Sequence, residues 1–215
     1  MSGVRMAIKN YKTVMKKLED KKKAPQNVMK AMYSDAKKRV PGWVATEVTK
    51  TYGIKKTDIT QKKVGDIKAV GSGIKDLKFV YSGRLLTPTH FSMSPKAPKS
   101  GGGYTLKASI LKGQKKTLGN VKKLTKKQRA SLQRGMRNSP QSPWMLQHTG
   151  AESADGVQYI PFQRREQPGK MKHVMKTISL PQMVSSERTK DNIQQAINEG
   201  LSKRLDHHMK RYMGE

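Results

Sequence analysis

The side chains whose type and spacing most clearly suggest a chemical role are the lysines and arginines of residues 112–137. Residues 77–151 contain no aspartate or glutamate, so no neighbouring carboxylate neutralises them. A dense array of such cations attracts phosphates or carboxylates and needs no cofactor. We therefore predict a surface that faces a polyanion or an acidic partner, formed by Lys112, Lys115, Lys116, Lys122, Lys123, Lys126, Lys127, Arg129, Arg134 and Arg137.

The ordinary interpretation of a charge run is a solvated loop without a ligand. In this chain one sign of charge persists over the whole stretch, which favours a binding arm instead. Neutralising Z phosphates makes the logarithm of the binding constant fall with the logarithm of salt concentration, with a slope of about −0.9Z. We therefore expect binding by this arm to weaken steeply as salt is added.

No other residues have the types and spacing of a catalytic or metal site. The carboxylates are scattered, and the sequence contains neither a phosphate-binding GxxxxGK[ST] loop nor a GxSxG nucleophile motif. The histidines lack the HExxH spacing of a zinc site, and we expect them at the surface or in interfaces: His90, His148, His173, His207 and His208. The sequence thus predicts no enzyme activity, no metal and no cofactor.

The overall composition limits the class of protein. The chain has 215 residues, 34% of them hydrophobic, with no cysteine and a formal net charge of +30. Charge of that size repels itself within one subunit, so we expect an assembly that neutralises it. The absence of cysteine excludes disulfides and thiolate metal sites. Without a signal-like segment or a long apolar run, we expect a soluble protein, made in a cytoplasm, with no membrane partner.

Helical periodicity marks both ends of the chain. Apolar residues recur at helical spacing in residues 5–20 and again in residues 24–53, where we expect Pro41 and Gly42 to break the helix. Near the C-terminus the same spacing predicts one long helix. Its stripe consists of Ile193, Ile197, Leu201, Leu205, Met209 and Tyr212.

Alternating apolar residues mark strands between these helices. Residues 67–71 and 77–81 predict a hairpin around Gly71 and Gly73, and residues 104–110 predict a strand that continues the same sheet. Between them we expect Leu85 and Phe91 to anchor the core. Residues 144–148 and 157–162 predict two further strands, and residues 174–180 predict a last one that ends at Pro181.

These elements together predict an α+β fold. We expect a small, mostly antiparallel sheet flanked by N-terminal helices and a long C-terminal helix, with a basic insertion arm. We expect the whole to form one domain with five parts: an N-terminal helical region (1–63), a first part of the sheet (64–111), the basic arm (112–142), a second part of the sheet (143–184) and the C-terminal helix (185–215).

Three stretches resemble the minor tail protein Z family of tailed bacteriophages: residues 83–91, 159–165 and 178–184, the last just before the final helix. The resemblance covers the chain from about Val28 onward, and residues 94–137 are longer and more basic than is typical of that family. The motif residues that carry it are Arg84, Pro88, Phe91, Phe162, Arg164, Leu180, Pro181 and Met183.

The resemblance implies a structural virion protein, located in the tail or neck and made in the cytoplasm of a bacterial host. Such a tail-completion or neck protein is expected to form a homo-oligomeric, hexameric ring around the DNA channel. Its expected partners are the tail terminator and the head connector, with non-specific contact to packaged DNA. On charge alone, the alternative is a non-catalytic basic DNA- or RNA-binding protein. A hydrolase or protease of phage assembly would need a nucleophile and a base that the sequence does not offer.

Overall fold

The computed structural model places the chain in two compact units. The first comprises residues 1–51, 55–84 and 179–215, and the second residues 52–54 and 85–178. Its helices and small antiparallel sheets confirm the predicted α+β class. The residues that the structure describes are 3–4, 24–98, 103–121, 125–127, 144–153, 156–163 and 173–213. The helix predicted for residues 5–20 lies outside them.

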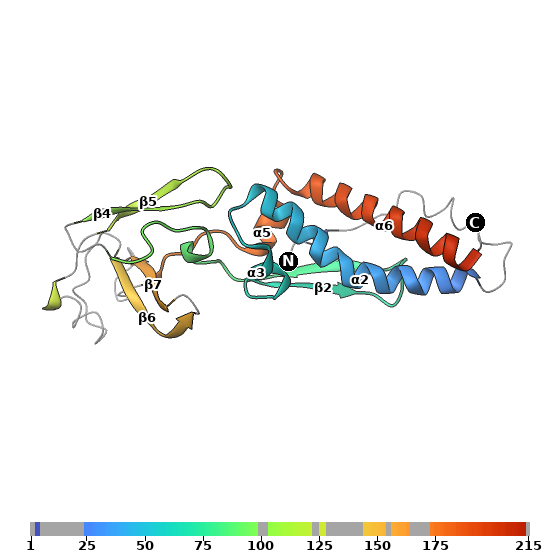
Figure 1. The fold of residues 1–215 in the computed structure, drawn as a ribbon, viewed down its shortest axis with the longest axis horizontal. Helices are drawn as coiled ribbons and strands as arrows, with labels where there is room; N and C mark the ends of the chain where they lie inside the picture. The colour runs from blue at the N-terminus through green and yellow to red at the C-terminus, as the bar shows by residue number, and fades with distance from the viewer. Residues whose placement is uncertain are drawn as a thin grey trace. The chain divides into compact units, whose positions relative to one another are not determined.

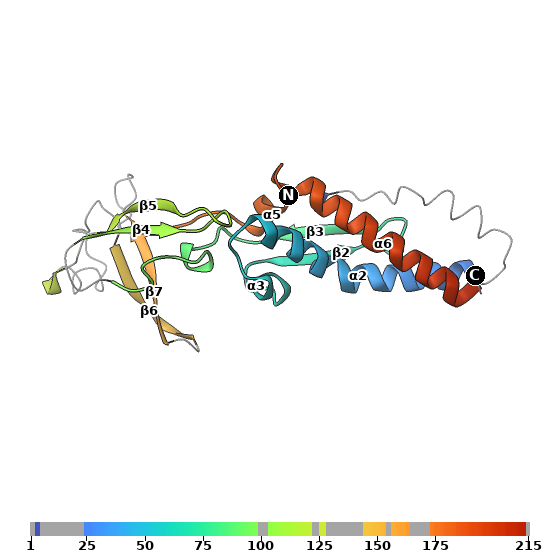
Figure 2. The same cartoon turned by 45° about the horizontal axis from the view of Figure 1, so that its top comes forward.

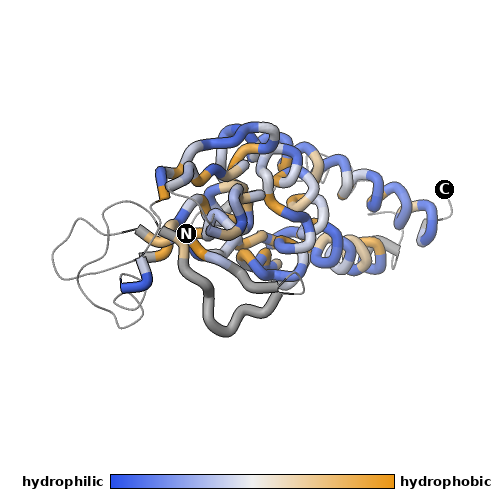
Figure 3. The backbone as a smooth tube through the Cα atoms, turned by 60° about the vertical axis from the view of Figure 1, so that its left-hand side comes forward, coloured by the Kyte–Doolittle hydropathy of each residue, from blue (hydrophilic) through white to orange (hydrophobic). Residues whose placement is uncertain are grey.

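Two long helices, α2 (Ala24–Thr51) and α6 (Lys190–Met213), lie side by side in the first unit (Figures 1 and 2). Figure 3 shows hydrophobic residues interspersed among hydrophilic ones along the backbone. The predicted C-terminal stripe is confirmed over its first four members, whereas Tyr212 is 37% exposed. The buried side chains at this interface and its flanks include Val28, Met32, Ala36, Val40, Val44, Val48, Ile193, Ile197, Leu201 and Leu205.

The predicted break at Pro41 and Gly42 is wrong, because α2 is one continuous helix through both residues. Proline removes one helical hydrogen bond, the one to the carbonyl of Lys37, four residues earlier. The apolar residues on either side of Pro41, Val40 and Val44, are both fully buried. Their burial favours the helix over the local preference for a break.

The first unit also contains the predicted hairpin, formed by β2 (Asp66–Val70) and β3 (Lys78–Ser82). With β1 (Gly3–Val4) they make an antiparallel sheet of order β1-β3-β2. The carboxylate of Asp76 closes the turn by accepting hydrogen bonds from the backbone N–H of Ser72 at 2.8 Å and of Gly73 at 2.7 Å. A short helix, α3 (Lys56–Thr60), precedes this hairpin.

The corner at Pro181 begins a helix, α5 (Leu180–Ser185), so the predicted end of the sheet at this corner is confirmed. The predicted strand of residues 174–180 is wrong, because only residues 173 and 174 form a strand there and the sheet does not reach residue 184. Ser179 caps this helix: its Oγ accepts from the N–H of Gln182 at 3.4 Å, and the Gln182 side chain accepts from the N–H of Ser179 at 2.9 Å. Pro181 lies in the first turn, where its missing N–H removes no helical bond. Leu180 and Met183 are fully buried.

The second unit holds two more sheets. One pairs β4 (Tyr104–Ala108) with β5 (Lys116–Val121), and the other has the order β6-β7-β8, formed by β6 (Trp144–Ser153), β7 (Gly156–Gln163) and β8 (His173–Val174). The prediction of one continuous sheet is therefore wrong. The strand at residues 104–108 pairs with the adjacent β5, which lies within the predicted basic arm.

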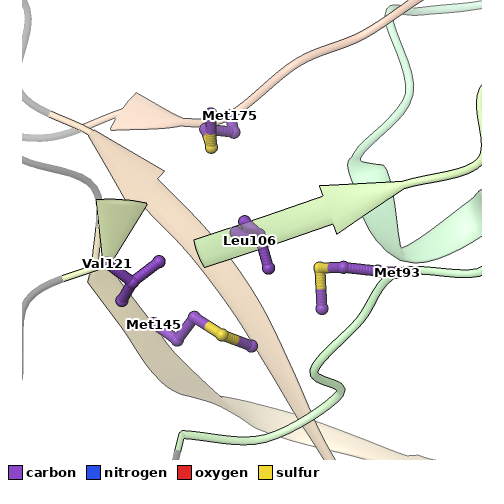
Figure 4. Packing of buried hydrophobic residues seen from close by; sticks show 5 residues of the cluster. All are labelled: Met93, Leu106, Val121, Met145 and Met175. Carbon is purple, nitrogen blue, oxygen red and sulfur yellow. The ribbon is translucent and has the colours of Figure 1, made fainter. Parts of the chain in front are cut away.

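A methionine-rich core underlies these strands. Figure 4 shows Met93, Val121, Met145 and Met175 gathered around the side chain of Leu106. Phe91 is fully buried as predicted, and the turn η1 (Pro88–His90) precedes it. Leu85 was a wrong prediction: it is 44% exposed, and its neighbour Leu86 is buried instead. The backbone fixes this choice, because Leu86 donates to Ile178 O at 3.2 Å and accepts from the N–H of Thr177 at 2.7 Å.

Candidate polyanion-binding surface

The hairpin of β4 and β5, here called the lysine hairpin (residues 104–121), carries the described part of the predicted basic surface. Lys112, Lys115 and Lys116 are exposed at its turn and at the start of β5, and Lys107 is exposed on β4. The first ten residues of the predicted arm thus belong to a β-hairpin. The arm prediction is corrected there, since residues 112–121 are a turn and a strand.

The local sequence explains why the hairpin forms. Leu106 and Ala108 alternate with exposed Thr105 and Lys107, so one face of β4 is buried and the other meets solvent. At the turn, Gly113 has a φ of 78°, and the N–H of Gln114 donates to Leu111 O at 3.1 Å. Glycine adopts that positive φ without steric cost.

Backbone bonds hold the hairpin in place on its β4 side. Ser94 and Lys107 exchange two hydrogen bonds of 2.8 and 2.9 Å, and Ser109 N–H donates to Phe91 O at 2.8 Å. Across the hairpin, the Thr105 hydroxyl donates to Asn120 Oδ1 at 3.0 Å. The lysines therefore project from a supported two-stranded ribbon.

The rest of the predicted basic set is only partly described. Lys126 and Lys127 are exposed in a short helical stretch. Five other members lie outside the described residues: Lys122, Lys123, Arg129, Arg134 and Arg137.

The motif residues that carry the family resemblance lie mostly in the interior. In the first unit Leu180 and Met183 are buried, Pro181 is half-buried and Arg84 is exposed. In the second unit Pro88 and Phe91 are buried and Phe162 is half-buried. Arg164 lies outside the described residues. The burial of Leu180, Met183, Pro88 and Phe91 indicates a packing role for these four residues.

Sequence reasoning missed a polar cluster between α2 and α6. His208 was predicted at a surface or interface, but it is 4% exposed, and its Nε2 lies 2.9 Å from Asp35 Oδ2. Arg204 donates to the same Asp35 oxygen, and Arg39 lies 3.6 Å from the other. One signal could have revealed the position: His208 follows Leu205 by three residues, on the apolar stripe of α6.

The cluster shifts the acidity of Asp35. Burial by itself raises the pKa of this carboxyl, but the hydrogen bonds from Arg204 and His208, with the charges of Arg204 and Arg39, lower it to about 2. Asp35 is therefore ionised at neutral pH and accepts hydrogen bonds from both partners. His207, the residue before His208, is exposed, and the charge of Arg204 lowers the pKa of its imidazole.

Among the residues that the structure describes, no group of three or more His, Asp or Glu is placed to hold a metal ion. None of the helices in the same ranges combines the length and apolar character needed to cross a lipid bilayer. Comparisons with models of protein families, with curated proteins and with solved structures find no match.

Proposed function

We propose that this chain is a structural protein of a tailed-phage virion: a tail-completion or neck protein that forms a ring between the head-proximal end of the tail and the head connector. Its role is assembly, without bond chemistry. The single observation that supports this most directly is the sequence of residues 178–184, whose resemblance to the minor tail protein Z family includes the corner into the last helix. In the fold this corner is a capped helix with Pro181 in its first turn, followed by α6.

The charge of the chain supports assembly around a polyanion. A lone subunit with a formal net charge of +30 repels itself, and DNA in a central channel offers the compensating phosphates. A hexameric ring would place several copies of the lysine hairpin around that channel. The tail terminator and the head connector would contact the faces of the ring.

The ring is tested by measuring the mass of the purified full chain. We expect size-exclusion chromatography with light scattering to give a closed oligomer, six subunits in the proposed ring, and negative-stain images to give annular particles. The measurement is repeated over a range of salt, with and without duplex DNA. A protein that stays monomeric under every condition contradicts the ring.

The second candidate is a basic DNA- or RNA-binding protein without a place in a virion. The observation that favours it is the set of exposed lysines on the lysine hairpin. The same chromatography distinguishes the two candidates. A monomer that binds a short duplex tightly and with sequence preference supports this candidate and excludes the ring.

A further inference from the structure

The exposed side chains of the lysine hairpin are all polar or cationic. On the strands they are Thr105, Lys107, Lys116, Thr117 and Asn120, and on the turn Lys112, Gln114 and Lys115. Its larger apolar side chains are turned into the second unit, where Leu106 and Val121 belong to the methionine-rich core. The ribbon therefore presents hydrogen-bond donors and positive charge to solvent.

The charges on this ribbon are not compensated by the described part of the protein. The second unit carries eighteen lysines and arginines against three aspartates and glutamates. Asp35, Glu47 and Asp66 of the first unit form ion pairs, and none of these pairs includes a hairpin lysine. An external anion can thus pair with these lysines without displacing an existing partner.

The composition of the ribbon favours nucleic acid over an acidic protein. Protein interfaces are built around desolvated aromatic and apolar side chains and are depleted in lysine. Phosphate backbones are instead contacted by lysine, threonine and asparagine side chains. The exposed side chains of the lysine hairpin match those that contact phosphate backbones.

The ribbon also favours a duplex over a single strand. Proteins that bind single strands stack the bases on exposed aromatic rings. The one aromatic residue of the hairpin, Tyr104, is half-buried, and its hydroxyl donates to Met145 Sδ at 3.1 Å. A two-stranded β-ribbon fits the major groove of B-form DNA, whereas the major groove of duplex RNA is too narrow and deep for side chains to read.

We propose that the lysine hairpin binds the sugar-phosphate backbone of double-stranded DNA, without sequence preference. Lys107, Lys112, Lys115 and Lys116 pair with phosphates, and the Thr117 hydroxyl and the Asn120 amide donate hydrogen bonds to the same backbone. This inference deepens the proposed function. It rests on that function only for the place of the contact, a DNA channel.

The test compares two variants that lose the same amount of charge. In the hairpin variant Lys107, Lys112, Lys115 and Lys116 are replaced by glutamine. In the control variant four exposed lysines of the first unit are replaced in the same way: Lys30, Lys38, Lys68 and Lys78. Binding to a fluorescent random-sequence duplex is measured by anisotropy across a salt series, with single-stranded DNA and duplex RNA of equal length as competitors. Circular dichroism first verifies that each variant is folded.

We expect the hairpin variant to bind the duplex at least about tenfold more weakly at low salt, with a salt slope smaller by up to about one for each lysine that contacts a phosphate. The control variant should keep most of the affinity and the slope. Equal losses in the two variants overturn the proposal, because they would show attraction to net charge alone. Stronger competition by single-stranded DNA or duplex RNA than by duplex DNA also overturns it.

The result is independent of the ring measurement. If the hairpin variant binds DNA like the unmodified protein while rings still form, the inference fails and the proposed function stands. If rings never form but DNA binding depends on the hairpin lysines, the inference stands and the proposed function fails.

Discussion

Asp35 on α2 and His208 on α6 are joined by a hydrogen bond of 2.9 Å although 173 positions separate them in the sequence. Because the pKa of Asp35 is lowered to about 2, its carboxylate is ionised at neutral pH and only accepts, so His208 Nε2 carries the hydrogen. Nδ1 of the same ring is buried and has no hydrogen-bond partner among the described residues. The bond therefore fixes the histidine tautomer and ties the two long helices together near the end of α6.

Removing the charge of Asp35 should weaken the contact between these helices. We expect Asp35→Asn to lower the free energy of unfolding by about 1 to 3 kcal/mol, because Arg204 and His208 lose an ionised acceptor in a partly buried place. Urea unfolding followed by circular dichroism at the helical band measures it, since both long helices belong to the first unit. Asp206→Asn, at an exposed position of α6, is the matched control and should change stability by less than about 0.5 kcal/mol. Equal effects of the two substitutions would contradict a special role for Asp35.

The same carboxylate predicts how stability depends on pH. The folded pKa of about 2 lies below the ordinary value of 3.8, so the unfolded chain binds this proton more tightly. The contribution of Asp35 is complete above about pH 4 and is lost as the pH falls towards 2. Asp76 titrates in the same direction, because the N–H groups of Ser72 and Gly73 lower its pKa to about 2. Thermal midpoints measured from pH 5 downward should therefore fall more steeply for the unmodified protein than for Asp35→Asn, and parallel curves would refute the assignment.

The close approach of α2 to α6 at Gly200 can be tested by adding one methyl group. A Cβ at this position would lie 2.6 to 2.8 Å from atoms of the Trp43 ring, too close without movement of the indole. We expect Gly200→Ala to destabilise the first unit by about 1 to 3 kcal/mol, although alanine is the better helix former. Combining it with Trp43→Leu should recover part of the loss when both are measured by the same urea unfolding.

Gly42→Ala is the control for this effect. Gly42 also lies inside a helix, but a Cβ there would meet nothing within 4 Å. Without a clash, only the helix preference remains, and the substitution should stabilise the protein by about 0.5 to 1 kcal/mol. Equal stabilisation of both alanine variants would contradict the close approach of Gly200 to the Trp43 ring.

The packing of α6 can be tested by a substitution in its buried apolar face. Leu201 is 2% exposed between the two long helices. Leu201→Ala should therefore lower the free energy of unfolding by about 2 to 5 kcal/mol, through lost burial and a residual cavity. Val70→Ala, in the same unit but 53% exposed, should cost less than about 1 kcal/mol. An unchanged melting temperature for Leu201→Ala would mean that α6 is not packed as described.

The sequence by itself determined the elements whose apolar residues repeat with one period. Ile193, Ile197, Leu201 and Leu205 predicted the buried face of α6, and the alternation around Gly71 predicted the hairpin of β2 and β3. The run of lysine and arginine in residues 112–137 predicted a basic surface, and its described members Lys112, Lys115, Lys116, Lys126 and Lys127 are exposed. Periodicity succeeds there because burial of a face is a local property of the pattern.

Only the tertiary structure decided which elements are partners. It paired β4 with β5 rather than with the first sheet, buried Leu86 rather than Leu85, and kept α2 continuous through Pro41. It also brought His208 to Asp35, a carboxylate with no sequence signal for such a contact. The physical reason is that each of these outcomes depends on the free energy of contacts between distant segments, which outweighs local preference and which no short stretch of sequence contains.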